Sequence, residues 1–210
     1  MQRNHYKSMI EKQVETRLPT RWGQFRMIAF SENIEEKMPH LAMVHESFDP
    51  SMPVHLRIHS ECLTGDLFGS SRCDCGDQMN KALEMAAKKG GVVLYLRQEG
   101  RGIGLINKLK AYNLQDTGLD TINANLHLGL EVDSRQYGIA IDMMHELGIT
   151  GIHLITNNPL KIEAIENSRI KVISRIPLII EANHENAGYL TTKEVKMGHL
   201  LDYGNNKNGQ

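Results

Sequence analysis

Hydrophobic and polar residues alternate along this chain with two different periods. A period of two between residues 14 and 30 flanks the segment LPTRWG, in which Pro19 and Gly23 favour a reversal, and this predicts a β-hairpin. Short apolar runs predict further strands at 41–45, 54–58, 92–96, 152–155 and 175–180.

Helical spacing of apolar residues falls mostly between these predicted strands. It predicts helices over 78–89, 106–114, 137–147, 159–167 and 191–201. Gly90 and Gly148 follow two of them, as glycine often does at a helix end, and Thr191 with Glu194 has the spacing of a capping box. The pattern indicates an α/β fold with mixed sheets, a β-hairpin-rich N-terminal part and helices packed on the sheets.

Size and charge narrow the class of protein. A chain of 210 residues suits a single domain, which we expect over 1–203, with a disordered polar tail over 204–210. Its longest apolar runs are too short to span a bilayer, and a net charge of −1 gives no general attraction to nucleic acid or anionic lipid. The polar N-terminus has no secretory signal, so we expect a cytoplasmic protein with neither nucleic acid nor membrane as a partner.

The three cysteines of the chain, Cys62, Cys73 and Cys75, fall within 14 consecutive positions of the sequence. In a reducing compartment such a cluster indicates a metal site or chemistry more than disulfides. Three thiolates suit a catalytic zinc with one open position. The alternatives are a structural site completed by one of the ten histidines, of which His55 and His59 are nearest in sequence, or three unrelated buried thiols.

Other polar segments have the chemistry of anion sites. Glycines and arginines around Glu99 suit a phosphate or a planar base, although a plain strand-to-helix turn has the same composition. Asp133 and Arg135 precede a predicted helix, where a cap and a solvated charge would be the simpler interpretation. Lys161 ends the run TNNPLK at a predicted helix start, which suits either an anion site or ordinary capping.

Six segments together resemble the GTP cyclohydrolase II family of riboflavin biosynthesis. They are RIHSECLTGDLFGSSRCDCG, RQEGRGIGLINKLKAYNLQD, GLDTINAN, VDSRQYG, LITNNPLK and KMGHLL. The resemblance runs from about Arg17 to Leu201 and implies an enzyme that hydrolyses GTP to a diamino-ribosylamino-pyrimidinone phosphate, formate and pyrophosphate. It also implies zinc, magnesium and a homodimer. Because the chain has no room for the dihydroxybutanone-phosphate synthase domain of some members, we expect the monofunctional form.

The resemblance assigns roles to individual residues. It implies that Cys62, Cys73 and Cys75 hold a catalytic zinc, and that Tyr112 completes the ring chemistry and formate release. The α-phosphate step falls to Asp133 and Arg135, with arginine as the nucleophile if Asp133 takes its proton, or as a stabiliser of charge if water attacks.

It further implies a substrate-binding set, in which Glu99 would accept hydrogen bonds from the guanine N–H groups. The set is Arg57, Ile58, His59, Ser60, Glu61, Gln78, Glu99, Gly100, Arg101, Thr121, Thr156 and Lys161.

Three positions depart from the family pattern, and one rival function fits the same motifs. Ser71 stands where leucine is expected, Asn123 where glutamate is common, and Leu160 where lysine is common, so the affinity for GTP is less secure than the reaction type. The rival is a zinc-stabilised GTP-binding regulatory protein without turnover. The presence of Asp133 and Arg135 argues against it.

Overall fold

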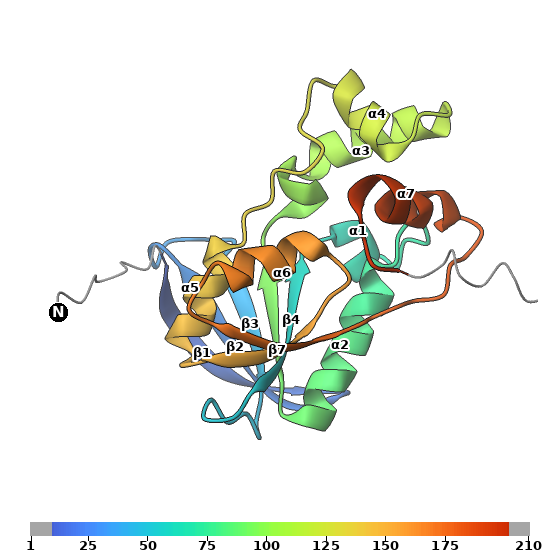
Figure 1. Cartoon of the computed structure of the whole chain (residues 1–210). Helices are drawn as coiled ribbons and strands as arrows, with labels where there is room; N and C mark the ends of the chain where they lie inside the picture. The colour runs from blue at the N-terminus through green and yellow to red at the C-terminus, as the bar shows by residue number, and fades with distance from the viewer. Residues whose placement is uncertain (1–9, 202–210) are drawn as a thin grey trace, which may run out of the picture.

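A single mixed sheet runs through the molecule, and helices cover both of its faces (Figure 1). The computed structural model describes residues 10–201. The strands are β1 (Glu11–Thr20), β2 (Gly23–Ser31), β3 (His40–His45), β4 (Val54–Ser60), β5 (Val92–Leu96), β6 (Gly151–Ile155) and β7 (Lys171–Ile176). Their order is β1-β2-β3-β5-β4-β6-β7, with antiparallel pairing from β1 to β5 and parallel pairing from β5 to β7. The predicted α/β class is confirmed, and the expected mixed sheets form one continuous sheet.

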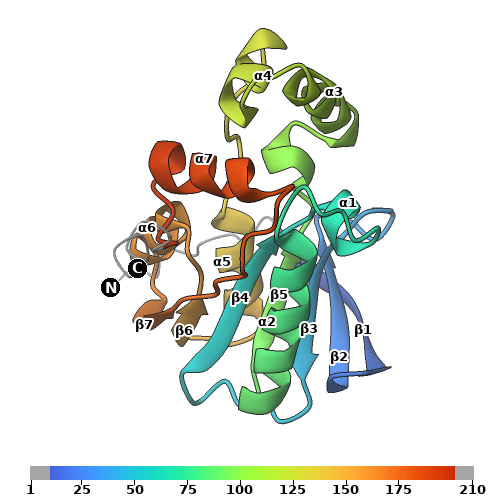
Figure 2. The same cartoon turned by 90° about the vertical axis from the view of Figure 1, so that its right-hand side faces the viewer.

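The helices divide into those that cover the sheet and those beyond its carboxyl edge (Figures 1 and 2). They are α1 (Leu63–Asp66), α2 (Cys75–Lys89), α3 (Leu105–Asp116), α4 (Thr121–His127), α5 (Gly138–Glu146), α6 (Pro159–Glu166) and α7 (Ala187–Met197), with a 3₁₀ turn over Glu99–Gly102. Apolar residues of α2 pack with Phe25 and Val93 on one face, whereas those of α5 and α6 pack with Phe30 and Leu94 on the other. The sheet is therefore buried on both faces, which explains the unbroken apolar runs of its central strands.

The predicted hairpin is confirmed as β1 and β2, with a difference at its turn. The reversal lies at Arg21 and Trp22, and Pro19 is still part of β1, opposite Gln24. Proline is tolerated there because β1 is an edge strand, whose outward backbone needs no ladder partner.

The prediction of the last strand at 175–180 was wrong. Strand β7 spans Lys171–Ile176 and stops before Pro177, which has no N–H for the ladder. Beyond it, Leu178 exchanges two hydrogen bonds with the Asn157 side chain, at 3.1 and 2.7 Å. The apolar run therefore continues beyond the end of β7. There the Asn157 side chain, and no neighbouring strand, provides the hydrogen-bond partners of the Leu178 backbone.

The predicted start of the C-terminal helix was also wrong. Helix α7 spans Ala187–Met197 and is followed by Gly198, whose backbone is in the left-handed conformation. Thr191 lies inside the helix and donates to the carbonyl of Ala187 at 2.8 Å, so it is no cap. A capping-box spacing is short and arises by chance within helices.

Beyond the carboxyl edge of the sheet, α3 and α4 form a projecting pair, and α7 lies beside them (Figure 2). The sequence analysis missed α4, whose N-cap is Asp120, accepting from the Asn123 amide. The predicted tail over 204–210 lies outside the described residues. In the part of the chain that the structure describes, no helix is both long and apolar enough to cross a membrane.

Candidate active site

A pocket opens at the carboxyl ends of the parallel strands β4, β5 and β6, where the loops that follow them meet. Crevices at this edge are the usual ligand sites of open α/β sheets. Most of the predicted site residues line it: Arg57, His59, Ser60, Glu61, Cys62, Cys73, Cys75, Gln78, Glu99, Gly100, Arg101, Tyr112, Thr121, Arg135, Thr156 and Lys161. Residues as far apart in sequence as Arg57 and Asn157 therefore line the same cavity.

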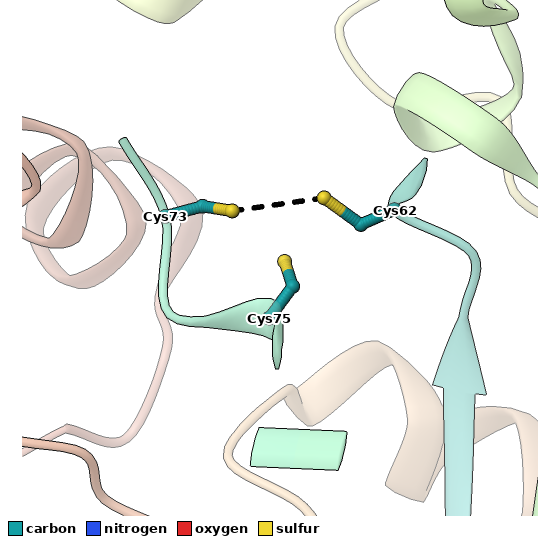
Figure 3. Close-up of side chains that lie close together, drawn as sticks. All are labelled: Cys62, Cys73 and Cys75. Atoms are coloured by element: carbon teal, nitrogen blue, oxygen red, sulfur yellow. Dashed lines mark hydrogen bonds between the residues drawn. The ribbon is translucent and has the colours of Figure 1, made fainter. Parts of the chain in front are cut away.

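The three cysteine side chains point toward one another (Figure 3). Their sulfur atoms lie within 4.8 Å of one another, with 3.6 Å between those of Cys62 and Cys73. Gly65 makes this approach possible, because a Cβ atom there would lie only 2.8 Å from the Cys73 sulfur. We call these three residues the cysteine cluster. Its spacing and donor atoms fit one thiophilic divalent metal ion.

Protein groups hold Cys62 from several sides. Its backbone N–H donates to Asp66 at 2.9 Å, and the Lys108 ammonium donates to its sulfur at 3.1 Å. Lys108 also donates to Glu99 at 2.8 Å, and Glu99 accepts from the backbone N–H of Leu63 at 2.6 Å. The first cysteine of the cluster is therefore fixed through both its backbone and its sulfur.

The thiols share protons within the cluster. Hydrogen bonds from the Cys73 and Cys75 thiols, helped by Lys108, lower the pKa of Cys62. The same hydrogen bond with Cys62, together with burial, raises the pKa of Cys73 to about 11. A metal ion binding to all three sulfurs would release the remaining protons, which is the usual coupling at thiolate sites.

Opposite in charge to these thiols is a set of basic residues that also lines the pocket, which we call the cationic cluster. It consists of Arg57, Arg101, Arg135, Lys161 and Lys193. In the described residues, both terminal nitrogens of Arg101 and the Nε atom of Arg57 are buried without a hydrogen-bond partner. Buried donors of this kind are suited to an anionic ligand, since an unsatisfied charged donor is costly.

Arg101 is held in an unusual backbone conformation, with φ at +62°. Its carbonyl accepts from the backbone N–H of Ser134 at 3.1 Å, and a Cβ atom on the neighbouring Gly102 would lie 2.3 Å from the Ser134 hydroxyl. This close contact joins the loop after β5 to the segment that carries Asp133 and Arg135. Backbone strain of this type persists where surrounding contacts enforce it, often at functional sites.

Asp133 and Arg135 form a two-point ion pair, and neither is a solvated surface charge. The Asp133 carboxylate accepts from the Arg135 side chain, with 2.8 Å between Nε and Oδ1, and also from its backbone N–H at 3.1 Å. Although burial opposes its charge, the hydrogen bond to Asp133 raises the pKa of Arg135. The guanidinium therefore remains protonated, with Asp133 orienting it.

Lys161 and His199 show how strongly positive this region is. Burial, together with Arg57 and Arg135, lowers the pKa of Lys161 well below its usual value, while its Nζ atom donates to the carbonyl of Ile58 at 2.7 Å. Burial and the surrounding cations, first Lys193, lower the pKa of His199 from 6.5 to about 3. His199 is therefore neutral at physiological pH.

Tyr112 lines the pocket next to Lys108, the lysine that contacts the cysteine cluster. The Lys108 Nζ atom lies 5.8 Å from its ring centroid, and the Arg72 guanidinium lies 5.0 Å away. Burial raises the pKa of Tyr112 to about 12. Its phenol is thus protonated at neutral pH and available as a hydrogen-bond donor.

Two predicted site residues do not line the pocket. Ile58 is fully buried in the core beneath it and reaches the site only through its carbonyl, while Asp133 stands behind Arg135. Leu160 and Asn123, two of the departures from the family pattern, are exposed and are not lining residues either.

Several lining residues were not identified from the sequence, among them Arg72, Lys108, Tyr189, Lys193 and His199. His199 stands in the KMGHLL segment, which was noted only for its resemblance. Lys193 forms a buried ion pair with Asp74 at 2.6 Å, across 119 positions of sequence. Nothing in the local pattern distinguishes such a lysine from a surface one.

Comparison with known proteins agrees with these features. The chain is 46% identical over 201 residues to riboflavin biosynthesis protein RibBA of Bacillus cytotoxicus and 48% identical to that of Bacillus cereus. Each alignment covers 95% of this chain and 50% of the relative, so the chain spans about half the length of these relatives.

Among solved structures, a two-domain 3,4-dihydroxy-2-butanone 4-phosphate synthase from A. baumannii, RibBX, matches 84% of this chain and 42% of its own. At a TM-score of 0.46 and 17% identity, this likeness carries no inference about the present protein. The family model described as GTP cyclohydrolase II, by contrast, matches residues 11–177, which include the cysteine cluster and most of the cationic cluster. The chain therefore belongs to the GTP cyclohydrolase II family.

Proposed function

We propose that this protein is a GTP cyclohydrolase II, which hydrolyses GTP to a diamino-ribosylamino-pyrimidinone phosphate, formate and pyrophosphate in riboflavin biosynthesis. The observation that carries the proposal is that one pocket holds a cluster of thiols and a cluster of buried cations. A nucleoside triphosphate has a neutral base at one end and a polyanion at the other. In this proposal the guanine base would lie next to the thiols, and the triphosphate would contact the cationic cluster.

On the base side, Cys62, Cys73 and Cys75 would hold zinc, the metal that thiolates in this number and spacing favour. Zinc there would supply the Lewis acidity that makes water nucleophilic at neutral pH. Tyr112, protonated and near the cluster, would donate a hydrogen bond during ring opening and formate release.

Glu99 can contribute less to the recognition of guanine than the sequence suggests. Its carboxylate already accepts from Lys108, from the Leu63 N–H and from the N–H of Gly100 at 2.7 Å. A carboxylate has about four acceptor sites, so one is free for guanine. In this proposal Glu99 makes at most one hydrogen bond to the base, and other groups of the set complete its recognition.

On the phosphate side, the cationic cluster with magnesium would neutralise the triphosphate. Arg135 would stabilise the charge that develops at the α-phosphate while water attacks. This role is favoured over nucleophilic attack because the ion pair with Asp133 keeps the guanidinium protonated.

The proposal also includes a homodimer. Homodimer formation follows the family resemblance and agrees with exposed apolar side chains at Leu67, Phe68 and Ile106, which are 68%, 73% and 73% exposed. A cytoplasmic location, a catalytic domain over 1–203 and the monofunctional form stay predictions. The relatives named RibBA are about twice as long as this chain.

The deciding experiment is to incubate the metal-analysed protein with GTP and magnesium and to measure formate, pyrophosphate and the pyrimidine product together. Equal amounts of all three, with formate lost after zinc chelation, are expected. If GTP binds but stays intact while zinc is present, the regulatory-protein alternative replaces this proposal.

A further inference from the structure

Lys108 is a buried lysine whose ammonium group lies between the sulfur of Cys62, a metal ligand in the proposed function, and the carboxylate of Glu99. It projects from α3, is 8% exposed, and lies 3.1 Å from the Cys62 sulfur and 2.8 Å from Glu99. A lysine loses much side-chain entropy and hydration on burial, so its position requires strong compensating contacts. These two contacts supply them.

Glu99 extends the same arrangement to the backbone of the metal loop. One of its oxygens accepts from Lys108 and Gly100, and the other accepts from the N–H of Leu63, the residue after Cys62. Lys108 thus contacts the Cys62 sulfur while Glu99 anchors the adjacent peptide. The two side chains together restrain the position and the orientation of that sulfur.

Charge gives the arrangement a second consequence. Three thiolates around a divalent ion carry one net negative charge, and surplus thiolate charge reduces the Lewis acidity of the metal. The ammonium of Lys108 balances that charge directly at one sulfur. Its hydrogen bond also withdraws electron density from the thiolate.

We propose that Lys108, held by Glu99, is a positioning residue of the metal centre that orients Cys62 and tunes the donor strength of its sulfur. The inference rests on the proposed function, because it requires metal at the cysteine cluster. It gives Glu99 a structural task in addition to the substrate contact implied by the family resemblance.

The test uses the 210-residue chain loaded with cobalt(II) or zinc, and compares Lys108→Met with the wild type. We expect the apparent zinc affinity, measured by chelator competition, to fall by about tenfold, because the Cys62 sulfur loses the contact that fixes its position and this loss outweighs the gain in donor strength; outer partners of metal ligands have effects of roughly 10–100-fold. The thiolate-to-cobalt absorption band should move to longer wavelength, because a sulfur without its hydrogen bond is a stronger donor. Lys108→Arg should restore part of both changes.

Lys110→Met is the matched control, since Lys110 lies on the same helix and is exposed. It should leave the band and the affinity unchanged. An unchanged band and affinity in Lys108→Met would overturn the proposal for Lys108 alone. Failure of the wild type to show any thiolate-to-cobalt band would instead overturn the metal centre of the proposed function.

Should Lys108→Met not fold, Glu99→Gln tests the same pair, since it keeps the size of the side chain but removes the charge that holds the ammonium. A smaller shift of the cobalt band in the same direction is expected. No shift in this variant would contradict the proposal.

Discussion

The cysteine cluster and the cationic cluster line the same pocket, but the protein satisfies their polar groups to different extents. In the cysteine cluster, the protein supplies partners for the reactive group: Asp66 and Lys108 bind Cys62, and Glu99 holds both the lysine and the adjoining peptide. In the cationic cluster, the described structure gives the Arg101 terminal nitrogens no partner and depresses the pKa of Lys161. The protein itself supplies partners for the Cys62 sulfur, whereas Arg101 and Arg57 of the cationic cluster keep unpartnered donor atoms that suit a ligand anion.

This difference follows from the size of what each side would bind. A metal ion needs ligands fixed within a few tenths of an ångström, which demands partners that restrain each sulfur. A triphosphate is neutralised by several cations at once, and their mutual repulsion in a buried site strengthens the attraction for it. The following variants break one side at a time.

The largest effect is expected from Cys73→Ser, which removes a ligand from the cysteine cluster. Zinc should be lost, and formate production should fall by more than about 100-fold, exceeding the usual effect of losing an outer partner. The fold should persist because both apolar cores lie on the sheet faces, away from the cluster. Metal analysis, product assay and thermal unfolding measure the three quantities.

Ser71→Ala, in the same loop at an exposed position, is the control and should keep its zinc. Loss of cooperative unfolding in Cys73→Ser would indicate that the metal is structural, as the alternative interpretation of the cysteines holds.

On the cationic side, Arg135→Ala should lower pyrophosphate release by about 10²–10³-fold, the range for loss of one charge-stabilising donor. The exposed Arg169→Ala is a matched control and should retain the wild-type rate. If formate still appears from GTP in Arg135→Ala, ring opening does not depend on the phosphate step. Wild-type pyrophosphate release would refute the role of Arg135.

A more selective effect is expected from Tyr112→Phe, which changes only the hydroxyl beside the cysteine cluster. Formate release should slow by about 100-fold, at the lower end for general acid–base groups, while pyrophosphate release continues. A formylated pyrimidine should therefore accumulate, detectable by mass spectrometry. Equal formate and pyrophosphate from this variant would remove Tyr112 from the mechanism.

The effect that is smallest at neutral pH concerns stability, and it grows only as the pH falls. His199 has a pKa of about 3 in the folded protein against 6.5 ordinarily, so between these values the unfolded chain binds a proton that the folded one does not. The free energy of unfolding should therefore decrease as the pH falls from about 6.5 toward 3. His199→Gln should reduce that slope in urea titrations, since it removes the titrating imidazole.

His184→Gln serves as the control, because the side chain of His184 is 99% exposed. The pH dependence of the free energy of unfolding should differ between the two variants only below about pH 6.5. Parallel pH profiles for His199→Gln and the wild type would show that the cations do not exclude the His199 proton.

The sequence predicted the fold best where local patterns were strong. The hairpin, the central strands and the segment from β6 through the Asn158 cap to α6 follow from alternation, apolar runs and capping chemistry. The prediction failed at β7 and α7, where Pro177 ended a strand within an apolar run and a chance capping box suggested a late helix start. At β7 an apolar run overlapped with a proline, and at α7 a capping-box spacing lay inside a helix. Tertiary contacts decided which of the two local patterns prevailed.

For the site, the spacing of the cysteines and the family motifs identified most of the residues that line the pocket. The sequence could not show that Glu99 binds Lys108, or that Lys193 reaches Asp74 from α7. Lysines of this kind are recognised only by their burial and by partners from distant elements. The family model ends at residue 177, so it does not include Lys193 or His199.

By itself, the sequence determined the α/β class, the cysteine cluster and the membership of a family, because periodicity, residue chemistry and motif spacing are local properties that survive without a fold. Only the tertiary structure decided which charges face each other. It joined the loops after β4, β5 and β6 at one edge of the sheet and placed α3 and α7 against them, so that the thiols and the cationic cluster line one pocket. Electrostatic environment depends on burial and on neighbours far away in sequence, and both are set by packing.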